Sequence, residues 1–152
     1  MDRTTYCIKT ILDLEGGYVW DPRDPGGETK YGISKRSYPN VDIKNLTETG
    51  AENIYLRDYW KKVSANSLLP PLDLYVFDAA VNQGVKTAIH LLQSVCGVPI
   101  TGVMDSQTLA ASRTILPNRY LQERAVLYSR NSNWTTYGTG WLNRLLIICR
   151  VG

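Results

Sequence analysis

The chain has 152 residues, of which 43% are hydrophobic and 20% are charged, and its formal net charge at pH 7 is +3. This length and composition are typical of a globular domain with a sizeable core, which argues against a disordered or fibrous protein. No apolar stretch is long enough to cross a membrane, and the N-terminus does not resemble a signal peptide. We therefore expect a protein made in the cytoplasm, which another system must deliver if it acts elsewhere.

The first predicted helix covers about residues 3–14 and ends at two consecutive glycines. Ile8, Ile11, Leu12 and Glu15 are spaced so that they share one helix face, and that face is the apolar one. Partial burial and the negative end of the helix dipole both favour a protonated carboxyl at Glu15. A protonated carboxyl suits a general acid, so Glu15 is a candidate catalytic residue. The alternative is an acid that frays into water at the helix end.

Residues 18–34 are rich in turn formers and predict an irregular β-hairpin, the only convincing β element in the sequence. Asp24 and Thr29 are polar groups that this hairpin can return toward Glu15. Glycosidic cleavage, for example, commonly needs a second carboxyl group beside the acid. Asp24 is one local candidate and Asp21 is another. Taken singly, Asp24 and Thr29 each have a structural interpretation that is the commoner one: Asp before Pro starts many turns, and Thr is an ordinary strand residue.

Helical patterns dominate the rest of the chain. Thr47 is the expected N-cap of a second helix over about 47–63. After two consecutive prolines, glycines and prolines separate five more predicted helices, at about 72–83, 86–96, 105–115, 118–130 and 139–149. The sequence therefore predicts an α+β fold that is mainly α, with one small β-hairpin near the N-terminus.

The cysteines and the single histidine offer no obvious framework for a disulfide or a metal site. Cys7, Cys96 and Cys149 are far apart and odd in number, so we expect reduced, buried residues. His90 has no second histidine or cysteine nearby, and metal binding is not expected. We expect no cofactor.

The charge is distributed unevenly along the chain. Residues 1–99 contain 11 Lys and Arg against 12 Asp and Glu, a balance of −1, whereas residues 100–152 contain six Arg against one Asp and one Glu, a balance of +4. A basic C-terminal third can attract an anionic polymer, or it can be an ordinary solvated helix face. Because there is no continuous basic run, a nucleic acid is the weakest candidate partner.

The segment EGGYVWDPRDPGGETKYGIS, residues 15–34, closely resembles the signature of the glycoside hydrolase 108 family of phage and bacterial muramidases. The resemblance continues in YWKKV (59–63), in VFDAAVNQG (76–84) and in GWLNR (140–144). It implies a lysozyme-like fold and hydrolysis of the bond between N-acetylmuramic acid and N-acetylglucosamine. The family's catalytic glutamate falls on Glu15.

The resemblance also assigns roles to other residues. The Glu–Asp–Thr arrangement of the phage-type lysozymes, a wider relative, falls on Glu15, Asp24 and Thr29. Residues 91–111 resemble a peptidoglycan-binding helical module, although Thr101 stands where that module usually has Asp. We therefore predict a single lysozyme-like domain over 1–152, with a catalytic part at about 1–84 and a peptidoglycan-binding-like part at about 85–152. The implied partner is the peptidoglycan glycan strand, and the implied state is a monomer that acts on the cell wall.

Four further residues are candidate substrate contacts, and each also has an ordinary structural interpretation. Trp20 and Tyr31 would stack on sugar rings if exposed, or join the core if buried. Asn82 and Gln83 end an apolar helix, where amides can bind acetamido groups or cap the helix. Asp78 lies among apolar residues in the same helix and is expected to be buried and paired.

Two alternatives to a muramidase remain open. A lytic transglycosylase would cut the same bond with one glutamate and form an anhydro sugar, so that Asp24 would be dispensable. A non-catalytic wall-binding or secretion-assisting protein would not need Glu15, which is present.

Overall fold

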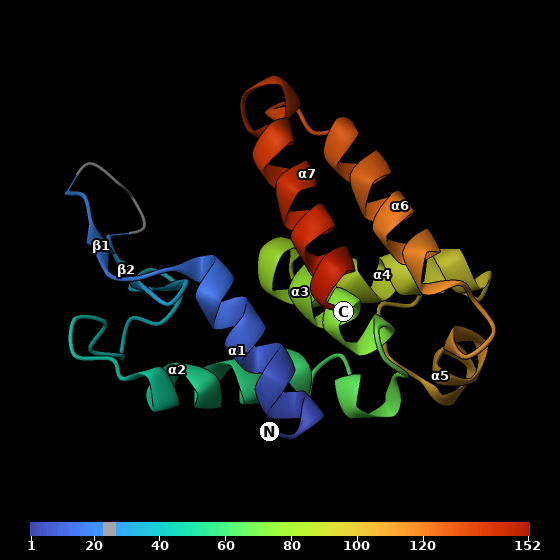
Figure 1. Ribbon diagram of the computed structural model, residues 1–152, viewed down its shortest axis with the longest axis horizontal. Helices are drawn as coiled ribbons and strands as arrows, with labels where there is room; N and C mark the ends of the chain where they lie inside the picture. The colour runs from blue at the N-terminus through green and yellow to red at the C-terminus, as the bar shows by residue number, and fades with distance from the viewer. Residues whose placement is uncertain (23–26) are drawn as a thin grey trace. The chain divides into compact units, whose positions relative to one another are not determined.

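The structure, a computed structural model, describes residues 1–22 and 27–152 (Figure 1). Within these residues the chain forms seven α-helices and one small antiparallel sheet, so the predicted mainly helical α+β class is confirmed. It divides into two compact units, Met1–Arg57 and Asp58–Gly152, which we call the N-terminal and the C-terminal unit. The predicted functional division at about residue 84 stays a prediction.

The N-terminal unit contains two helices and a three-stranded sheet. Helix α1 starts at an N-cap, because the carboxylate of Asp2 accepts a hydrogen bond from the backbone N–H of Thr5 at 3.0 Å. The helix ends where Gly16 takes a positive φ of 78°. The elements of this unit are α1 (Arg3–Glu15), β1 (Val19–Trp20), β2 (Glu28–Lys30), β3 (Ile33–Ser34) and α2 (Glu48–Tyr55).

The sheet has the antiparallel order β1-β2-β3, with Thr29 of β2 opposite Val19 on one side and Ser34 on the other. The predicted hairpin is thus extended by a third strand of two residues, too short to leave a pattern in the sequence. Tyr31 and Gly32 connect β2 to β3 with positive φ angles of 52° and 74°. Two such residues form a tight turn whose twist matches that of the flanking strands.

The second helix is shorter than the sequence predicts. Thr47 caps it as expected, accepting a hydrogen bond from the N–H of Gly50 at 3.1 Å. However, α2 ends at Tyr55, and the chain continues in a wider π-helical segment, η1 (Leu56–Trp60). Trp60 at its end is buried edge-on against Phe77, with ring centroids 5.2 Å apart.

Helix α3 forms the centre of the C-terminal unit, because every residue from Leu72 to Ala80 is buried. A helix that is apolar on nearly all sides needs neighbours around it, and α4, α6 and α7 all contact α3 (Figure 1). The elements of this unit are η2 (Ala65–Ser67), α3 (Leu72–Gln83), α4 (Val85–Cys96), α5 (Ser106–Ser112), α6 (Pro117–Ser129) and α7 (Trp134–Val151).

The buried amide of Gln93 organises the turn between α4 and α5. Its oxygen accepts from the N–H groups of Thr101 and Gly102, both at 2.9 Å, and its nitrogen donates to the hydroxyls of Thr101 and Thr108. Asp105 then caps α5 through the backbone N–H of Thr108. Residues 91–111, the part of the sequence that resembles a peptidoglycan-binding module, therefore contain a tightly bonded turn between two helices, in which the Thr101 hydroxyl takes part.

Helix α7 starts at Trp134, five residues earlier than predicted, because Gly138 and Gly140 do not interrupt it. In its apolar run only Leu145 and Ile148, which share one face, are buried. Cys149 lies off that face and is exposed, so the prediction that this cysteine is buried was wrong.

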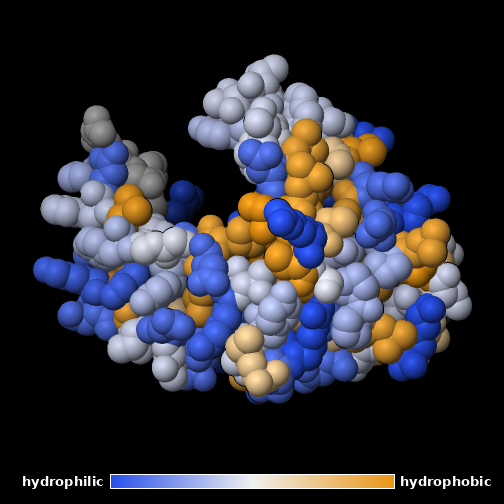
Figure 2. Space-filling model, in the orientation of Figure 1, coloured by the Kyte–Doolittle hydropathy of each residue, from blue (hydrophilic) through white to orange (hydrophobic). Residues whose placement is uncertain are grey.

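Exposed hydrophobic side chains gather along α7 (Figure 2). Leu146 is 67% exposed and Ile147 44% exposed. Leu142 and Leu146 line a groove of about 340 Å³ together with residues of α6. In the described part of the chain, no helix has the length and apolar character needed to span a membrane.

The two glycines of α7 provide a matched test of its packing. A methyl group at Gly138 would come within 2.7 Å of the Trp134 ring, whereas one at Gly140 would meet nothing within 4 Å. Because alanine favours a helix over glycine by about 1 kcal/mol, Gly140→Ala should stabilise the protein by up to that amount. Gly138→Ala should destabilise it, because Trp134 must move. Urea unfolding measures both free energies, and equal stabilisation by the two changes would contradict this packing.

Candidate active site

Glu15 is the last residue of α1 and lies at the edge of the core of the N-terminal unit. Ile8, Ile11 and Leu12 on the same face are buried, and Glu15 itself is half-buried. The predicted placement of this acid at the end of a core-facing stripe is confirmed. Asp13, two residues earlier, is exposed.

The turn between β2 and β3 lies directly against Glu15. The N–H of Tyr31 donates to the carbonyl of Gly16 at 3.1 Å, and the Tyr55 hydroxyl donates to the carbonyl of Tyr31 at 2.7 Å. A methyl group built on Gly32 would lie 2.8 Å from Oε2 of Glu15 and 2.6 Å from the Tyr55 hydroxyl. Position 32 therefore requires glycine for two reasons: its φ is positive, and the backbone approaches the acid too closely for a side chain.

The other predicted residues of this unit lie on the sheet. Thr29 is half-buried at the middle of β2. Trp20 on β1 is 63% exposed, so the condition for stacking on a ligand is met. Tyr31 is half-buried at the turn, with the ammonium group of Lys30 5.6 Å from the centre of its ring. Asp24 lies outside the described residues.

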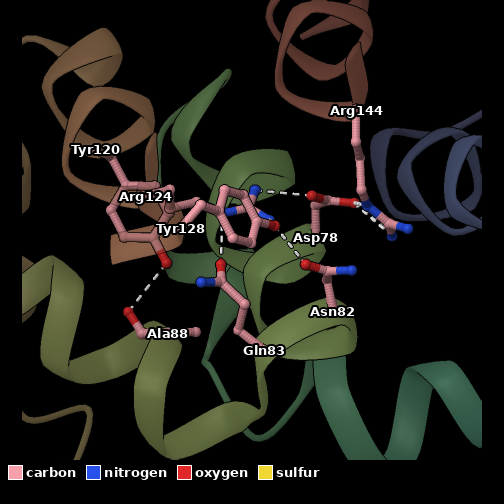
Figure 3. Close-up of polar contacts among 8 residues, drawn as sticks. All are labelled: Asp78, Asn82, Gln83, Ala88, Tyr120, Arg124, Tyr128 and Arg144. Atoms are coloured by element: carbon pink, nitrogen blue, oxygen red, sulfur yellow. Dashed lines mark hydrogen bonds and ion pairs between the residues drawn. The ribbon is translucent and has the colours of Figure 1, made fainter. Parts of the chain in front are cut away.

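Asp78 is the centre of a buried ionic network in the C-terminal unit (Figure 3). Its side chain is fully buried, and Oδ2 accepts a hydrogen bond from Nη1 of Arg124 at 2.7 Å. Oδ1 accepts from Nε of Arg144 at 2.9 Å and is 2.8 Å from Nη2 of the same residue. The predicted buried and paired state of Asp78 is confirmed. A carboxylate from α3 thus joins guanidinium groups from α6 and α7.

The same network reaches the two amides at the end of α3. Nε of Arg124 donates to Oε1 of Gln83 at 2.9 Å, and Nη2 donates to the Tyr128 hydroxyl at 3.0 Å. That hydroxyl in turn donates to Oδ1 of Asn82. The sequence left open whether these amides cap the end of α3. The cap of α3 is Gly84, whose N–H donates to the carbonyl of Ala80.

Burial and the neighbouring carboxylate shift the pKa of Arg124 in opposite directions. Burial works against the charged form of Arg124, but the Asp78 carboxylate favours it, and the pKa of Arg124 stays above its ordinary value. Burial raises the pKa of Tyr128 and, more strongly, that of Tyr120, whose hydroxyl donates to the carbonyl of Ala88 at 3.0 Å (Figure 3). Both phenols therefore stay neutral, and Arg124 stays charged, at physiological pH.

Asn82 and Gln83 also line a pocket of about 500 Å³ in the C-terminal unit. Sequence reasoning found these two residues but missed those that α4, α6, α7 and the α6–α7 connection contribute. Only Trp141 lay within a quoted motif, GWLNR. The lining residues are Asn82, Gln83, Thr87, Leu127, Tyr128, Arg130, Asn131 and Trp141.

Comparisons with known proteins found a matching family and a similar solved structure. The family model described as glycosyl hydrolase 108 matches residues 8–84, which include Glu15, the sheet and α3. A solved structure, that of Brucella abortus SagA, is 32% identical to this chain, with a TM-score of 0.83 over 97% of this chain and 92% of that one. No curated protein matches the chain.

The match to SagA extends over nearly the whole chain, and the lysozyme-like α+β fold class is thereby confirmed. The family match covers about half of the chain and contains the candidate acid. The protein is therefore a glycoside hydrolase of the peptidoglycan-hydrolase type, and the chain belongs to glycosyl hydrolase family 108.

Proposed function

We propose that the protein is a lysozyme-type N-acetylmuramidase, which hydrolyses the bond between N-acetylmuramic acid and N-acetylglucosamine in peptidoglycan. The observation that carries this proposal is the position of Glu15, half-buried at the end of α1 and in contact with the backbone of the Tyr31–Gly32 turn. The substrate lies outside the cytoplasmic membrane, so the protein acts on the cell wall.

In this mechanism Glu15 is the general acid. It donates its proton to the glycosidic oxygen as the bond to C1 breaks, and positive charge develops on the sugar ring. Tyr55 is a positioning residue, because its hydroxyl holds the carbonyl of Tyr31 and so fixes the turn against the acid. A rigid turn limits the orientations of the Glu15 carboxyl before the substrate binds.

The second group of the reaction is Asp24, by resemblance to the phage-type lysozymes. It activates water or stabilises the positive charge, and Thr29 assists from β2. Trp20 supports this assignment of the sheet to substrate binding, because a largely exposed aromatic ring offers a flat face to a sugar. Tyr31 offers a second ring at the turn that contacts Glu15.

The products of purified peptidoglycan test the proposal directly. Mass spectrometry should find disaccharides with a reducing-end muramic acid, because water completes the reaction. Predominantly 1,6-anhydro products would show a lytic transglycosylase instead, and products ending in glucosamine would place the cut at the other bond.

A substitution at Glu15 tests whether this residue is the general acid. Glu15→Gln should reduce lysis to background, because the amide keeps the shape but has no transferable proton. The thermal midpoint should stay unchanged or rise, since catalytic groups often cost stability. Asp13→Asn is the control, because it removes an exposed carboxylate two residues away. A folded Glu15→Gln protein that still clears cell walls would refute the mechanism.

Asp24→Asn should lower turnover by about two to four orders of magnitude, which is typical of a group in acid–base catalysis, and leave folding intact. Asp21→Asn should leave turnover within a few-fold of the original. Steady-state rates on labelled peptidoglycan measure both. The reverse ranking would move the role of the second carboxylate to Asp21.

Gly32→Ala should abolish most activity, because the methyl group would displace the Glu15 carboxyl or the Tyr55 hydroxyl. Gly97→Ala is the control, since Gly97 has a similar positive φ of 66° but open space around it. Both changes carry a strain of about 1–2 kcal/mol, and only Gly32→Ala should also lower turnover by at least about tenfold. Equal turnover in the two variants would show that the turn does not position the acid.

A further inference from the structure

The pocket at the end of α3 has features that the proposed cleavage reaction does not use. It lies within the C-terminal unit, and its volume of about 500 Å³ suits a ligand the size of one or two sugar units or a short peptide. Its walls come from α3, α4, α6, α7 and the segment that joins the last two helices. Four properties of these walls limit the chemistry of the ligand.

The first property is the orientation of the two amides. The oxygen of Gln83 accepts from Arg124, and the oxygen of Asn82 accepts from Tyr128, so both oxygens face the buried network. The two NH₂ groups are turned away from it (Figure 3) and donate to no described residue. Because both residues line the pocket and their oxygens are taken up, hydrogen-bond donors are what the two amides have left for a ligand.

The second property is charge. Arg130 lines the pocket and is exposed, and no acidic residue is among the described lining residues. Beneath the pocket, one carboxylate, Asp78, faces two guanidinium groups, so the network keeps one net positive charge. This arrangement favours a ligand with a carboxylate and several acceptor oxygens.

The third property is an aromatic wall. Trp141 is half-buried and stacks on Tyr128, with ring centroids 5.0 Å apart and planes at 20°. Trp134 and Tyr137 lie beside it, with ring centroids 6.4 Å and 6.0 Å from that of Trp141. Aromatic walls with a few convergent polar groups are typical of ligand sites and offer apolar surface to the carbon face of a sugar.

The fourth property is rigidity. Arg124 is fully buried and its guanidinium group donates to Asp78, Gln83 and Tyr128 together. Those contacts hold the donors in place before a ligand arrives, which lowers the entropic cost of binding. Arg124 is thus a positioning residue for the pocket.

We propose that this pocket binds an N-acetylated sugar that carries a carboxylate, namely a muramyl unit of peptidoglycan. Arg130 pairs with the carboxylate, which belongs either to the lactyl group or to the peptide stem. The NH₂ groups of Asn82 and Gln83 donate to carbonyl oxygens of the same unit, and Trp141 contacts the sugar. The inference rests on the proposed function, because it takes its ligand from the same polymer, and it adds a specificity-determining residue, Arg130.

Calorimetric titration of the full chain tests the proposal with three soluble ligands. Chitotetraose has acetamido groups and no carboxylate. N-acetylglucosaminyl-N-acetylmuramic acid adds the lactyl carboxylate, and the same disaccharide with an L-Ala-D-Glu stem carries its carboxylates on the stem. The two muramyl ligands lack the bond that a muramidase cuts, and mass spectrometry after the titration checks that they stay intact.

Arg130→Gln should weaken binding of a carboxylate-bearing ligand by about tenfold, the effect of losing one charge-assisted pair, and leave chitotetraose unchanged. Arg119→Gln is the matched control, because Arg119 is an exposed arginine on α6, the helix that ends directly before Arg130, but does not line the pocket. A loss seen already with the disaccharide assigns the carboxylate to the lactyl group, and a loss seen only with the stem-bearing ligand assigns it to the peptide.

Three results would overturn the proposal: no measurable binding of any muramyl ligand, equal losses for charged and neutral ligands, or equal losses in the Arg119→Gln control. Cleavage is scored separately, by the products from intact peptidoglycan. The binding site can therefore fail while the muramidase stands, and the muramidase can fail while the carboxylate-dependent binding stands.

Discussion

The C-terminal unit depends on one buried carboxylate, that of Asp78. Burial of a charge is costly unless it is paired, and loss of one partner from a buried pair typically costs about 3–5 kcal/mol. Arg124 and Arg144 meet this requirement from α6 and α7, so the charge can be satisfied only when the three helices are packed together. The ionic contact therefore selects the helix arrangement, while the surrounding apolar residues supply most of the burial.

In the N-terminal unit the corresponding constraint is the lack of a side chain at Gly32. The backbone there approaches Glu15 more closely than any other residue type would allow. The two units thus orient their polar groups by different means. Around Glu15, a tight turn and the Tyr55 hydroxyl limit the space, whereas around Asn82 and Gln83 a guanidinium group and a phenol take up the amide oxygens.

Local patterns in the sequence predict what depends on neighbours in the chain. The helix phase places Glu15 beside the buried Ile11 and Leu12, and an acid within an apolar helix predicts that Asp78 is buried and paired. The partners of Asp78 are 46 and 66 residues away, and no periodicity connects such distant positions. The pocket beside α3 was missed for the same reason, because most of its walls come from later helices.

Glycine shows where local patterns mislead. The sequence predicts that the last helix begins at about residue 139, yet α7 begins at Trp134 and runs through Gly138, against which the ring of Trp134 packs. Tertiary packing here outweighs the low helix propensity of glycine.

The buried contact between Asp78 and Arg124 also affects the pocket that Asn82 and Gln83 line. Asn82 lies one helical turn beyond Asp78 on the same face of the helix, and Gln83 follows directly, so a buried acid is succeeded by two amides that line the pocket. Arg124 contacts Asp78 and Gln83 directly, and Asn82 through Tyr128. A flip of the Gln83 amide would leave Nε of Arg124 without its acceptor, and a flip of the Asn82 amide would do the same to the Tyr128 hydroxyl. The donor character of the pocket is therefore a consequence of the core packing.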